Sequence, residues 1–208
     1  YLKLAYLPNP GAVRLRLSAY EVEGESVSKE IERQFEALRK IIPHNIIGYE
    51  TATMQELVHK LLTERGLTLA TAESCTGGSI AARFTAMPGA SAYFLCGVVS
   101  YSNASKHDIL GVAPEVIARH GAVSEEVARR MAEGARRISG ADCAIATTGI
   151  AGPAGGSAEK PVGTVWIAVA TSHRTTAILK QCGSDRGQII DRASAFAISL
   201  LRDELNGK

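Results

Sequence analysis

The alternation of hydrophobic and polar positions divides the chain into two regions with different patterns. In the first region, residues 13–19 alternate strictly, as in a strand with one exposed face. Ser28 is the expected N-cap of a helix that Pro43 ends. The apolar face of this helix consists of Ile31, Phe35, Leu38 and Ile42. Residues 1–48 therefore predict a small α+β fragment, which is too short to bury a sizeable core alone.

From about residue 50 onward, segments with helical and strand periods alternate. Strands are expected at residues 67–71, 96–101, 144–148, 165–170 and 175–179. Helices are expected from Met54 to a stop at Gly66, after the turn at 72–78, and over residues 125–138 and 188–205. The run 96–101 is mostly apolar and reads as a buried-type strand, and the last two strands are close enough to form a hairpin.

This order of elements predicts an α/β fold, specifically a three-layer α/β/α sandwich. The terminal hairpin makes the expected sheet of about five strands mixed and mostly parallel, rather than wholly parallel. We place the boundary between the two regions after residue 48, which gives a partial N-terminal unit (1–48) and a larger domain (49–208). Because the chain begins with Tyr1 rather than Met, we expect it to be a piece of a longer protein.

Composition narrows the possible functions. The net charge of +2 is too small to favour nucleic acid or an anionic membrane as a partner. No apolar run approaches the roughly 18 residues of a membrane span, and no signal peptide is visible, so a cytoplasmic location is expected. The four cysteines and five histidines lack the spacing of a disulfide framework or a metal site. We therefore expect no metal and no cofactor.

The segment 72–78, Ala-Glu-Ser-Cys-Thr-Gly-Gly, follows a predicted strand and precedes a predicted helix. Such a turn places a nucleophile and free backbone N–H groups together, as acyl transfer and phosphate binding require. It is not the Gly-x-Ser-x-Gly elbow, because Ala72 stands where the first glycine would be. Ser74 is the candidate nucleophile. Cys75 is the alternative nucleophile, but no histidine is obviously paired with it as a base. On its own, the turn fits an ordinary βα connection equally well.

Three further segments at strand ends combine with this turn into a recognisable set of four. They are Glu73–Gly78, Tyr101-Ser102-Asn103-x-x-Lys106, the glycine-rich run 147–156 and Gly183–Arg186. Together with Lys160-Pro161-Val162-Gly163-Thr164-Val165, they resemble the C-terminal domain of the CinA family, the nicotinamide mononucleotide deamidases, from about residue 52 to the end. Residues 1–48 look like the latter part of that family's central KH-like domain. They contain no Gly-x-x-Gly loop, so RNA binding gains no support.

The resemblance implies hydrolysis of nicotinamide mononucleotide to nicotinate mononucleotide and ammonia. Its catalytic residues fall on Ser74, Lys106 and Tyr101, with Arg186 beside them. A lysine can act as the base for a serine if its ammonium form is destabilised. Ser105–Asp108 reads as a capping box, which would put Lys106 at the first helical position, where the helix dipole lowers its pKa. Burial and Arg186 would act in the same direction, and Tyr101 would relay the proton or hold Lys106.

The chemistry of the residues themselves suggests candidates that bind the substrate. The backbone N–H groups of Cys75, Thr76, Gly77 and Gly78 are candidates for stabilising an oxyanion. The phosphate would bind either Arg186 or the glycine-rich loop. Further candidates are Asn103, Thr148, Gly149, Gly152, Gly155 and Gly156. Glu73 either orients the site or caps the following helix.

Two functional classes remain open at this stage. One is the serine–lysine amidase, and the other is a catalytically silent nucleotide-binding or regulatory domain. The joint presence of Ser74, Tyr101, Lys106 and Arg186 favours the enzyme. The expected partners are nicotinamide mononucleotide and a second copy of the chain in a homodimer, without nucleic acid or membrane.

Overall fold

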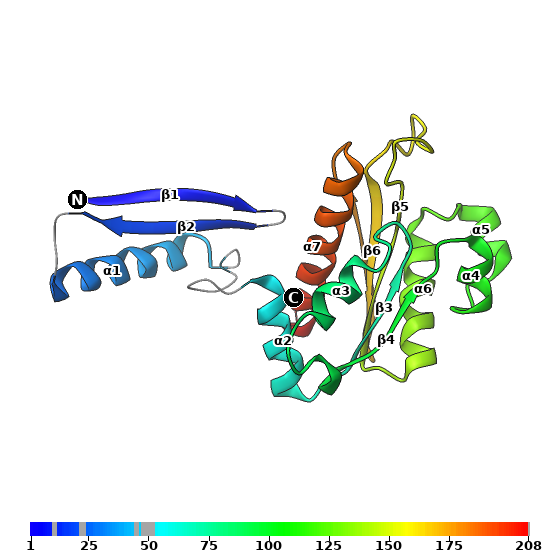
Figure 1. Cartoon of the computed structure of the whole chain (residues 1–208), viewed down its shortest axis with the longest axis horizontal. Coiled ribbons are helices and arrows are strands. Elements are labelled where there is room, and N and C mark those ends of the chain that lie inside the picture. Colours follow the sequence, from blue (N-terminus) through cyan, green and yellow to red (C-terminus); the bar gives the residue numbers. More distant parts are fainter. Residues whose placement is uncertain (10–11, 21–23, 44–45, 47–52, 208) are drawn as a thin grey trace. The chain divides into compact units, whose positions relative to one another are not determined.

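The computed structural model describes residues 1–9, 12–20, 24–43, 46 and 53–207, and the chain forms two compact units, Tyr1–Ala52 and Thr53–Lys208. Figure 1 shows both. The smaller unit contains the antiparallel strands β1 (Leu2–Asn9) and β2 (Ala12–Ala19), followed by helix α1 (Glu25–Ile41). Among its described residues, Val27 alone has a buried side chain. The fragment is thus α+β with very little core.

The sequence predicted the elements of this unit only in part. Strand β2 was expected, but β1 was not, because residues 4–7 are all apolar and do not alternate. Helix α1 begins after Gly24, so the prediction of Ser28 as N-cap was wrong. The helix has an additional first turn, which includes the buried Val27. The sequence also indicates a turn at Asn9-Pro10-Gly11 and a short strand at Ile46–Ile47, but both depend on residues outside the described ones.

The larger unit is built on one five-stranded sheet. Its strands, in spatial order, are β4 (Phe94–Val99), β3 (Leu69–Glu73), β5 (Cys143–Gly149), β6 (Thr164–Ala170) and β7 (Thr175–Gln181). Strand β3 pairs in parallel with both β4 and β5, whereas β6 is antiparallel to β5 and to β7. Four of the five strands therefore run in the same direction, and the predicted mixed sheet is confirmed.

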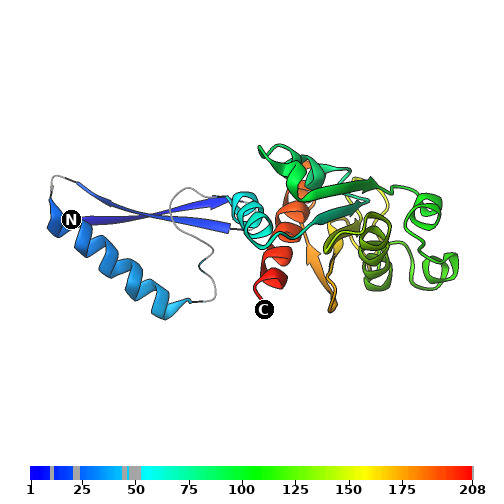
Figure 2. The same ribbon diagram turned by 90° about the horizontal axis from the view of Figure 1, so that it is seen from below.

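Helices cover both faces of this sheet, as Figures 1 and 2 show. Helices α2 (Met54–Arg65), α3 (Ser79–Thr85) and α7 (Arg186–Leu205) pack on one face. Helix α6 (Glu125–Ser139) covers the other, next to the short helices α4 (Asn103–Asp108) and α5 (Pro114–His120). A single 3₁₀ turn, Ala90–Ala92, precedes β4. The three-layer α/β/α sandwich is thus the fold of this unit.

Side-chain size differs between the two faces of the sheet. In β5, Cys143 and Ile145 pack with α2, α3 and α7, whereas Ala144 and Ala146 face α6. The small alanines allow α6 to lie close to the strands. Gly134 allows an equally close approach on the helix itself, because a Cβ there would overlap the carbonyl oxygen of Leu110. This packing brings the start of α6 to the ends of the strands, where the polar segments singled out from the sequence gather.

Some sequence expectations about burial were wrong. Strand β4 lies at the edge of the sheet, where Leu95 and Val99 are each 49% exposed. A mostly apolar run is compatible with either an edge or a central strand, so the pattern could not decide this. Ile138 continues the apolar stripe of the helix predicted at 125–138, which indicates an inward position, but it is 44% exposed near the end of α6. Within the described residues, no helix is both long and apolar enough to cross a membrane.

Candidate active site

Ser74 lies in the turn between β3 and α3, at the carboxyl end of the parallel strands. Its side chain and backbone are only 8% exposed, and its amide N–H donates to the carbonyl of Thr147 at 3.0 Å. The turn closes when the Gly77 N–H donates to the Ser74 carbonyl at 3.1 Å. Gly77 and Gly78 have φ angles of 62° and 98°, a left-handed conformation that glycine adopts without strain. The glycine pair is therefore required by the shape of the turn.

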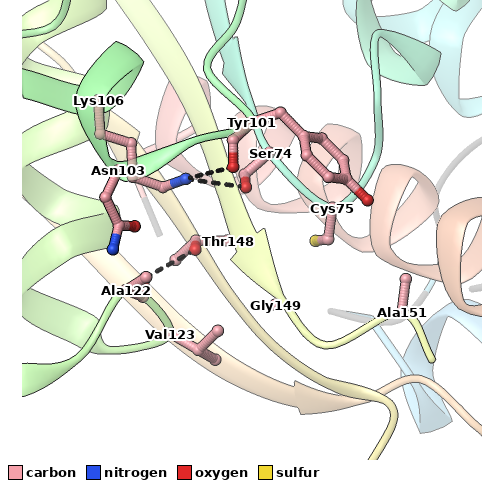
Figure 3. A pocket seen from close by; sticks show the side chains of 10 residues that line it. All are labelled: Ser74, Cys75, Tyr101, Asn103, Lys106, Ala122, Val123, Thr148, Gly149 and Ala151. Carbon is pink, nitrogen blue, oxygen red and sulfur yellow. Dashed lines mark hydrogen bonds between the residues drawn. The ribbon is translucent and has the colours of Figure 1, made fainter. Parts of the chain in front are cut away.

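Lys106 reaches this turn from helix α4 on a separate segment of chain. It is 1% exposed, and its Nζ donates to Ser74 Oγ at 3.0 Å. The same nitrogen donates to the carbonyl oxygens of Ser100 at 2.9 Å and Tyr101 at 3.3 Å. Figure 3 draws the hydrogen bonds from Nζ to Ser74 and to Tyr101 as dashed lines. The predicted nucleophile and the predicted base are thus in direct contact.

The start of helix α4 differs from the prediction. Ser102 is the N-cap, and it forms a reciprocal capping box with Ser105, so the helix begins at Asn103. Lys106 is consequently the fourth helical residue rather than the first, and the predicted box starting at Ser105 was wrong. Ser102 is the N-cap because the segment after the strand leaves it in an extended conformation, with φ −87° and ψ 162°, which an N-cap residue requires.

The pKa of Lys106 is nevertheless lowered from its ordinary value. Burial is the main cause, because removing the ammonium from water disfavours the charged form. Proximity to Cys75 opposes this effect. The direction therefore agrees with the expectation from the sequence, and burial, one of the three causes expected there, is the main one.

Tyr101 and Arg186 form a second contact at the edge of the site. The Tyr101 hydroxyl accepts from Arg186 Nη2 at 3.0 Å, and Arg186 Nη1 donates to the carbonyl of Gly152 at 2.7 Å. The Tyr101 ring points away from Lys106 in Figure 3, and the residue is 60% exposed. Tyr101 thus holds Lys106 through its backbone carbonyl, while its hydroxyl contacts Arg186.

A pocket of about 180 Å³ opens over Ser74. Seven of the residues singled out from the sequence line it: Ser74, Cys75, Tyr101, Asn103, Lys106, Thr148 and Gly149. Of its other lining residues, Ala122 and Val123 were missed, whereas Ala151 lies inside the glycine-rich run 147–156 but was not named as a candidate. They carry no chemistry that a sequence motif would reveal. Lys160, which belongs to one of the motif segments, contacts this wall of the pocket: its Nζ donates to the Val123 carbonyl at 2.8 Å.

Several other candidates lie outside the lining of this pocket. The buried Thr76 hydroxyl bonds to that of Thr147 at 2.7 Å. Gly155 and Gly156 are exposed, beyond the part of the loop that reaches the pocket. Gly152 is buried, and a Cβ there would lie 2.6 Å from Val162 Cγ1, so this glycine is needed for packing. These residues shape the loops around the pocket.

The amides of the turn divide into two pairs. The N–H of Gly77 is engaged by the Ser74 carbonyl, and that of Gly78 by Glu73 Oε2 at 3.1 Å. The N–H groups of Cys75 and Thr76 donate to no other residue in the described part of the chain. The Gly77 and Gly78 amides are therefore occupied, and the two free amides next to Ser74 are the available hydrogen-bond donors.

The thiol of Cys75 lies beside Ser74, and its Sγ is visible at the pocket in Figure 3. Burial raises its pKa to about 12, and nearby Cys182 acts in the same direction. A thiol with that pKa stays protonated at neutral pH, and the thiolate is the reactive form. The electrostatics therefore favour Ser74 over Cys75 as nucleophile. Among the described residues, no group of three His, Cys, Asp or Glu side chains could hold a metal ion.

Comparison with known proteins places this domain in a family. The CinA C-terminal domain model matches residues 51–205. A CinA-like protein of Chloroherpeton thalassium is 46% identical over 207 residues, which cover 98% of this chain and 49% of that protein. A putative competence-damage inducible protein of Caldanaerobacter subterraneus is 43% identical over 205 residues, covering 99% of this chain and 50% of that one. The chain thus spans about half the length of these relatives.

Solved structures agree with the fold. The competence/damage inducible protein CihA from Agrobacterium tumefaciens is 40% identical, with a TM-score of 0.70, and the match covers 77% of this chain and 99% of that one. The competence damage-inducible protein A from Klebsiella pneumoniae is 37% identical with a TM-score of 0.71, over 74% of this chain and 95% of that one. On this family match, these identities and the shared fold, the chain belongs to the CinA family.

Proposed function

We propose that this chain is an amidase that hydrolyses nicotinamide mononucleotide to nicotinate mononucleotide and ammonia. The single observation that carries the proposal is the 3.0 Å contact between Lys106 Nζ and Ser74 Oγ inside a pocket. A serine hydroxyl becomes a useful nucleophile when an adjacent base removes its proton. Lys106 meets this need, because its burial favours the neutral amine.

A neutral amine can also make the three contacts of Lys106, with the Ser74 hydroxyl then donating to Nζ instead of accepting from it. A neutral amine has two N–H donors and one lone pair, whereas an ammonium has donors only. The carbonyl oxygens of Ser100 and Tyr101 can only accept, so they engage the two N–H groups. The lone pair is then left for the hydroxyl proton of Ser74. The two carbonyls thus orient the base toward the nucleophile.

The proposed reaction has two stages. Lys106 takes the proton from Ser74 Oγ as that oxygen attacks the carboxamide carbon, and the tetrahedral intermediate is stabilised by the free N–H groups of Cys75 and Thr76. The C–N bond then breaks, and Lys106 returns the proton to the leaving nitrogen, which departs as ammonia. Water, activated by the same lysine, hydrolyses the acyl–serine ester and restores both residues.

The size of the pocket indicates that only part of the substrate lies inside it. At about 180 Å³, it is smaller than the roughly 300–1,000 Å³ of pockets that bury drug-sized ligands. We therefore place the pyridine carboxamide inside and the ribose phosphate at the mouth. Arg186 lies there, bonded to Tyr101, which lines the pocket. Two guanidinium nitrogens have partners, and the remaining N–H donors suit a phosphate oxygen.

Ammonia release from nicotinamide mononucleotide by the purified chain tests this function. We expect turnover that Ser74→Ala abolishes and that Ser91→Ala, a change of an exposed serine, leaves intact. Binding of the nucleotide without ammonia release would instead identify a catalytically silent nucleotide-binding domain. Absence of both binding and turnover would contradict the substrate assignment itself.

A further inference from the structure

The carboxylate of Glu73 is fully buried immediately before the nucleophile. Its Oε2 accepts from the backbone N–H groups of Gly78 at 3.1 Å and Ile80 at 3.0 Å, and its Oε1 accepts from Ala81 at 2.8 Å. Within the described residues, no Lys or Arg forms an ion pair with it. A buried acidic group satisfied entirely by backbone amides is an unusual feature, and none of the chemical steps above uses it.

These three hydrogen bonds join two elements across the turn. Glu73 is the last residue of β3, and its partners lie at the start of α3. The four residues between them, 74–77, are therefore held at both ends. Because the carboxylate takes the amide of Gly78, and Ser74 takes that of Gly77, only the Cys75 and Thr76 amides stay free.

The contact between base and nucleophile depends on a different part of Glu73. Its backbone carbonyl accepts from the Ser100 N–H at 2.8 Å, and the Ser100 carbonyl accepts from Lys106 Nζ at 2.9 Å. A substitution of the Glu73 side chain leaves this backbone route in place. The Ser74–Lys106 pair and the shape of the 74–77 turn can therefore be perturbed separately.

We propose that Glu73 is a positioning residue that aims the Cys75 and Thr76 amides at the oxyanion of the tetrahedral intermediate. This inference rests on the proposed amidase function. A glutamine has the same shape, but it offers one acceptor oxygen, and its NH₂ group would face the N–H donors of α3. Glu73→Gln therefore removes part of the restraint on the turn, while ground-state contacts in the pocket remain.

Binding of two ligands to the full chain measures the stabilisation of the tetrahedral state and of the ground state separately. Pyridine-3-boronic acid mimics the first: Ser74 Oγ adds to boron, its proton passes to Lys106, and a tetrahedral boronate anion forms. For Glu73→Gln, we expect its affinity to fall at least about tenfold, as for loss of an oxyanion donor. Nicotinamide mononucleotide, bound to the Ser74→Ala background, should change by less than about threefold, and kcat should fall without a matching rise in KM. Glu115→Gln, an exposed change, is the control.

Each outcome decides the inference. Equal losses for both ligands, an unchanged boronate affinity, or failure of Glu73→Gln to fold would assign Glu73 to general stability and overturn the positioning role. A parent chain that neither releases ammonia nor binds the boronate would refute the proposed function, and the role of Glu73 with it. A parent that is active, combined with a variant that lacks the selective loss, would refute only the role of Glu73.

Discussion

Lys106 Nζ lies 3.0 Å from Ser74 Oγ, although 32 positions separate the two residues in the sequence. The contact exists because β3 and β4 are parallel neighbours, so the segments that follow them leave the sheet at the same edge. Ser74 follows β3 directly, and the loop after β4 leads into α4, which carries Lys106. Parallel pairing thus makes a site from two distant motifs, as is common in open α/β sheets.

Lys106→Arg should inactivate the chain nearly as completely as Ser74→Ala. Arginine keeps the charge, but it does not lose its proton in a protein, so it cannot act as a general base. We expect kcat/KM to fall by about 10²–10⁴, the usual contribution of a general base. Steady-state ammonia release measures this, with the exposed Lys60→Arg as control. Retention of more than about a tenth of kcat/KM, a loss of only about 1.4 kcal/mol, would exclude Lys106 as the base.

The pH dependence of activity should follow the protonation of the same lysine. Only neutral Lys106 accepts the proton of Ser74, so kcat/KM should rise with pH as the ammonium deprotonates and fall as pH drops. Because burial lowers the pKa of Lys106, this rise should be centred below the ordinary lysine value of 10.5. A pH–rate profile of the parent chain measures it. An activity that is flat across this range, or that rises as the solution becomes more acidic, would contradict a neutral-lysine mechanism.

The sequence alone could predict the turn around Ser74, because the residues that determine it are close together in the sequence. The strand before Ser74, the glycine pair and the following helix lie within a few residues of one another. The start of α4 was harder, because Ser102 and Ser105 are both good caps, and the choice between them depends on where β4 ends. Local chemistry was ambiguous at that point, and tertiary structure decided it.

The apolar wall of the pocket could not be predicted, for a different reason. Ala122 and Val123 have no polar group and lie in none of the motif segments, and Ala151 lies in the glycine-rich run 147–156 but has only a methyl group to distinguish it. Their position results from long-range contacts, such as the Lys160 hydrogen bond to the Val123 carbonyl. The edge position of β4 and the existence of β1 likewise depend on which strands pair, which periodicity does not encode.

Cys75→Ala should retain most of the activity. Burial raises the pKa of the Cys75 thiol to about 12, so it carries almost no thiolate at neutral pH. We expect kcat/KM within about tenfold of the parent, since the change removes only a pocket-lining sulfur. Parallel assays of Cys75→Ala and Ser74→Ala compare the two candidate nucleophiles. Inactivation by the cysteine change, with activity left in the serine variant, would reverse the assignment.

Gly134→Ala should destabilise the larger unit. A Cβ at this position would overlap the Leu110 carbonyl oxygen, which is backbone and cannot rotate away. Overpacking of this kind typically costs about 1–3 kcal/mol, against a gain of up to about 1 kcal/mol from helix propensity. Thermal or urea unfolding measures the difference. An unchanged or raised midpoint would show that α6 and the Leu110 segment are less closely packed than described.

Arg186→Lys should raise KM for nicotinamide mononucleotide far more than it lowers kcat. The guanidinium now donates to Gly152 and Tyr101, which fixes its plane, and its remaining donors suit a bidentate contact with phosphate. Lysine offers a point charge without that fork, so the nucleotide should bind less tightly while the carboxamide still reaches Ser74. Steady-state kinetics on the parent and variant separate the two constants.

The phosphate-free nucleoside is the matched control for that experiment. If Arg186 binds the phosphate, nicotinamide riboside should be a poor substrate for the parent, and Arg186→Lys should change its kinetics little. If the riboside is already as good a substrate as the nucleotide, Arg186 does not serve as the phosphate anchor. Its bond to the Tyr101 hydroxyl would then be its main contribution, and Tyr101→Phe should reproduce the effect of Arg186→Lys. A drop in kcat with unchanged KM in both variants would identify that case, because it reports a contact needed in the reaction rather than in substrate binding.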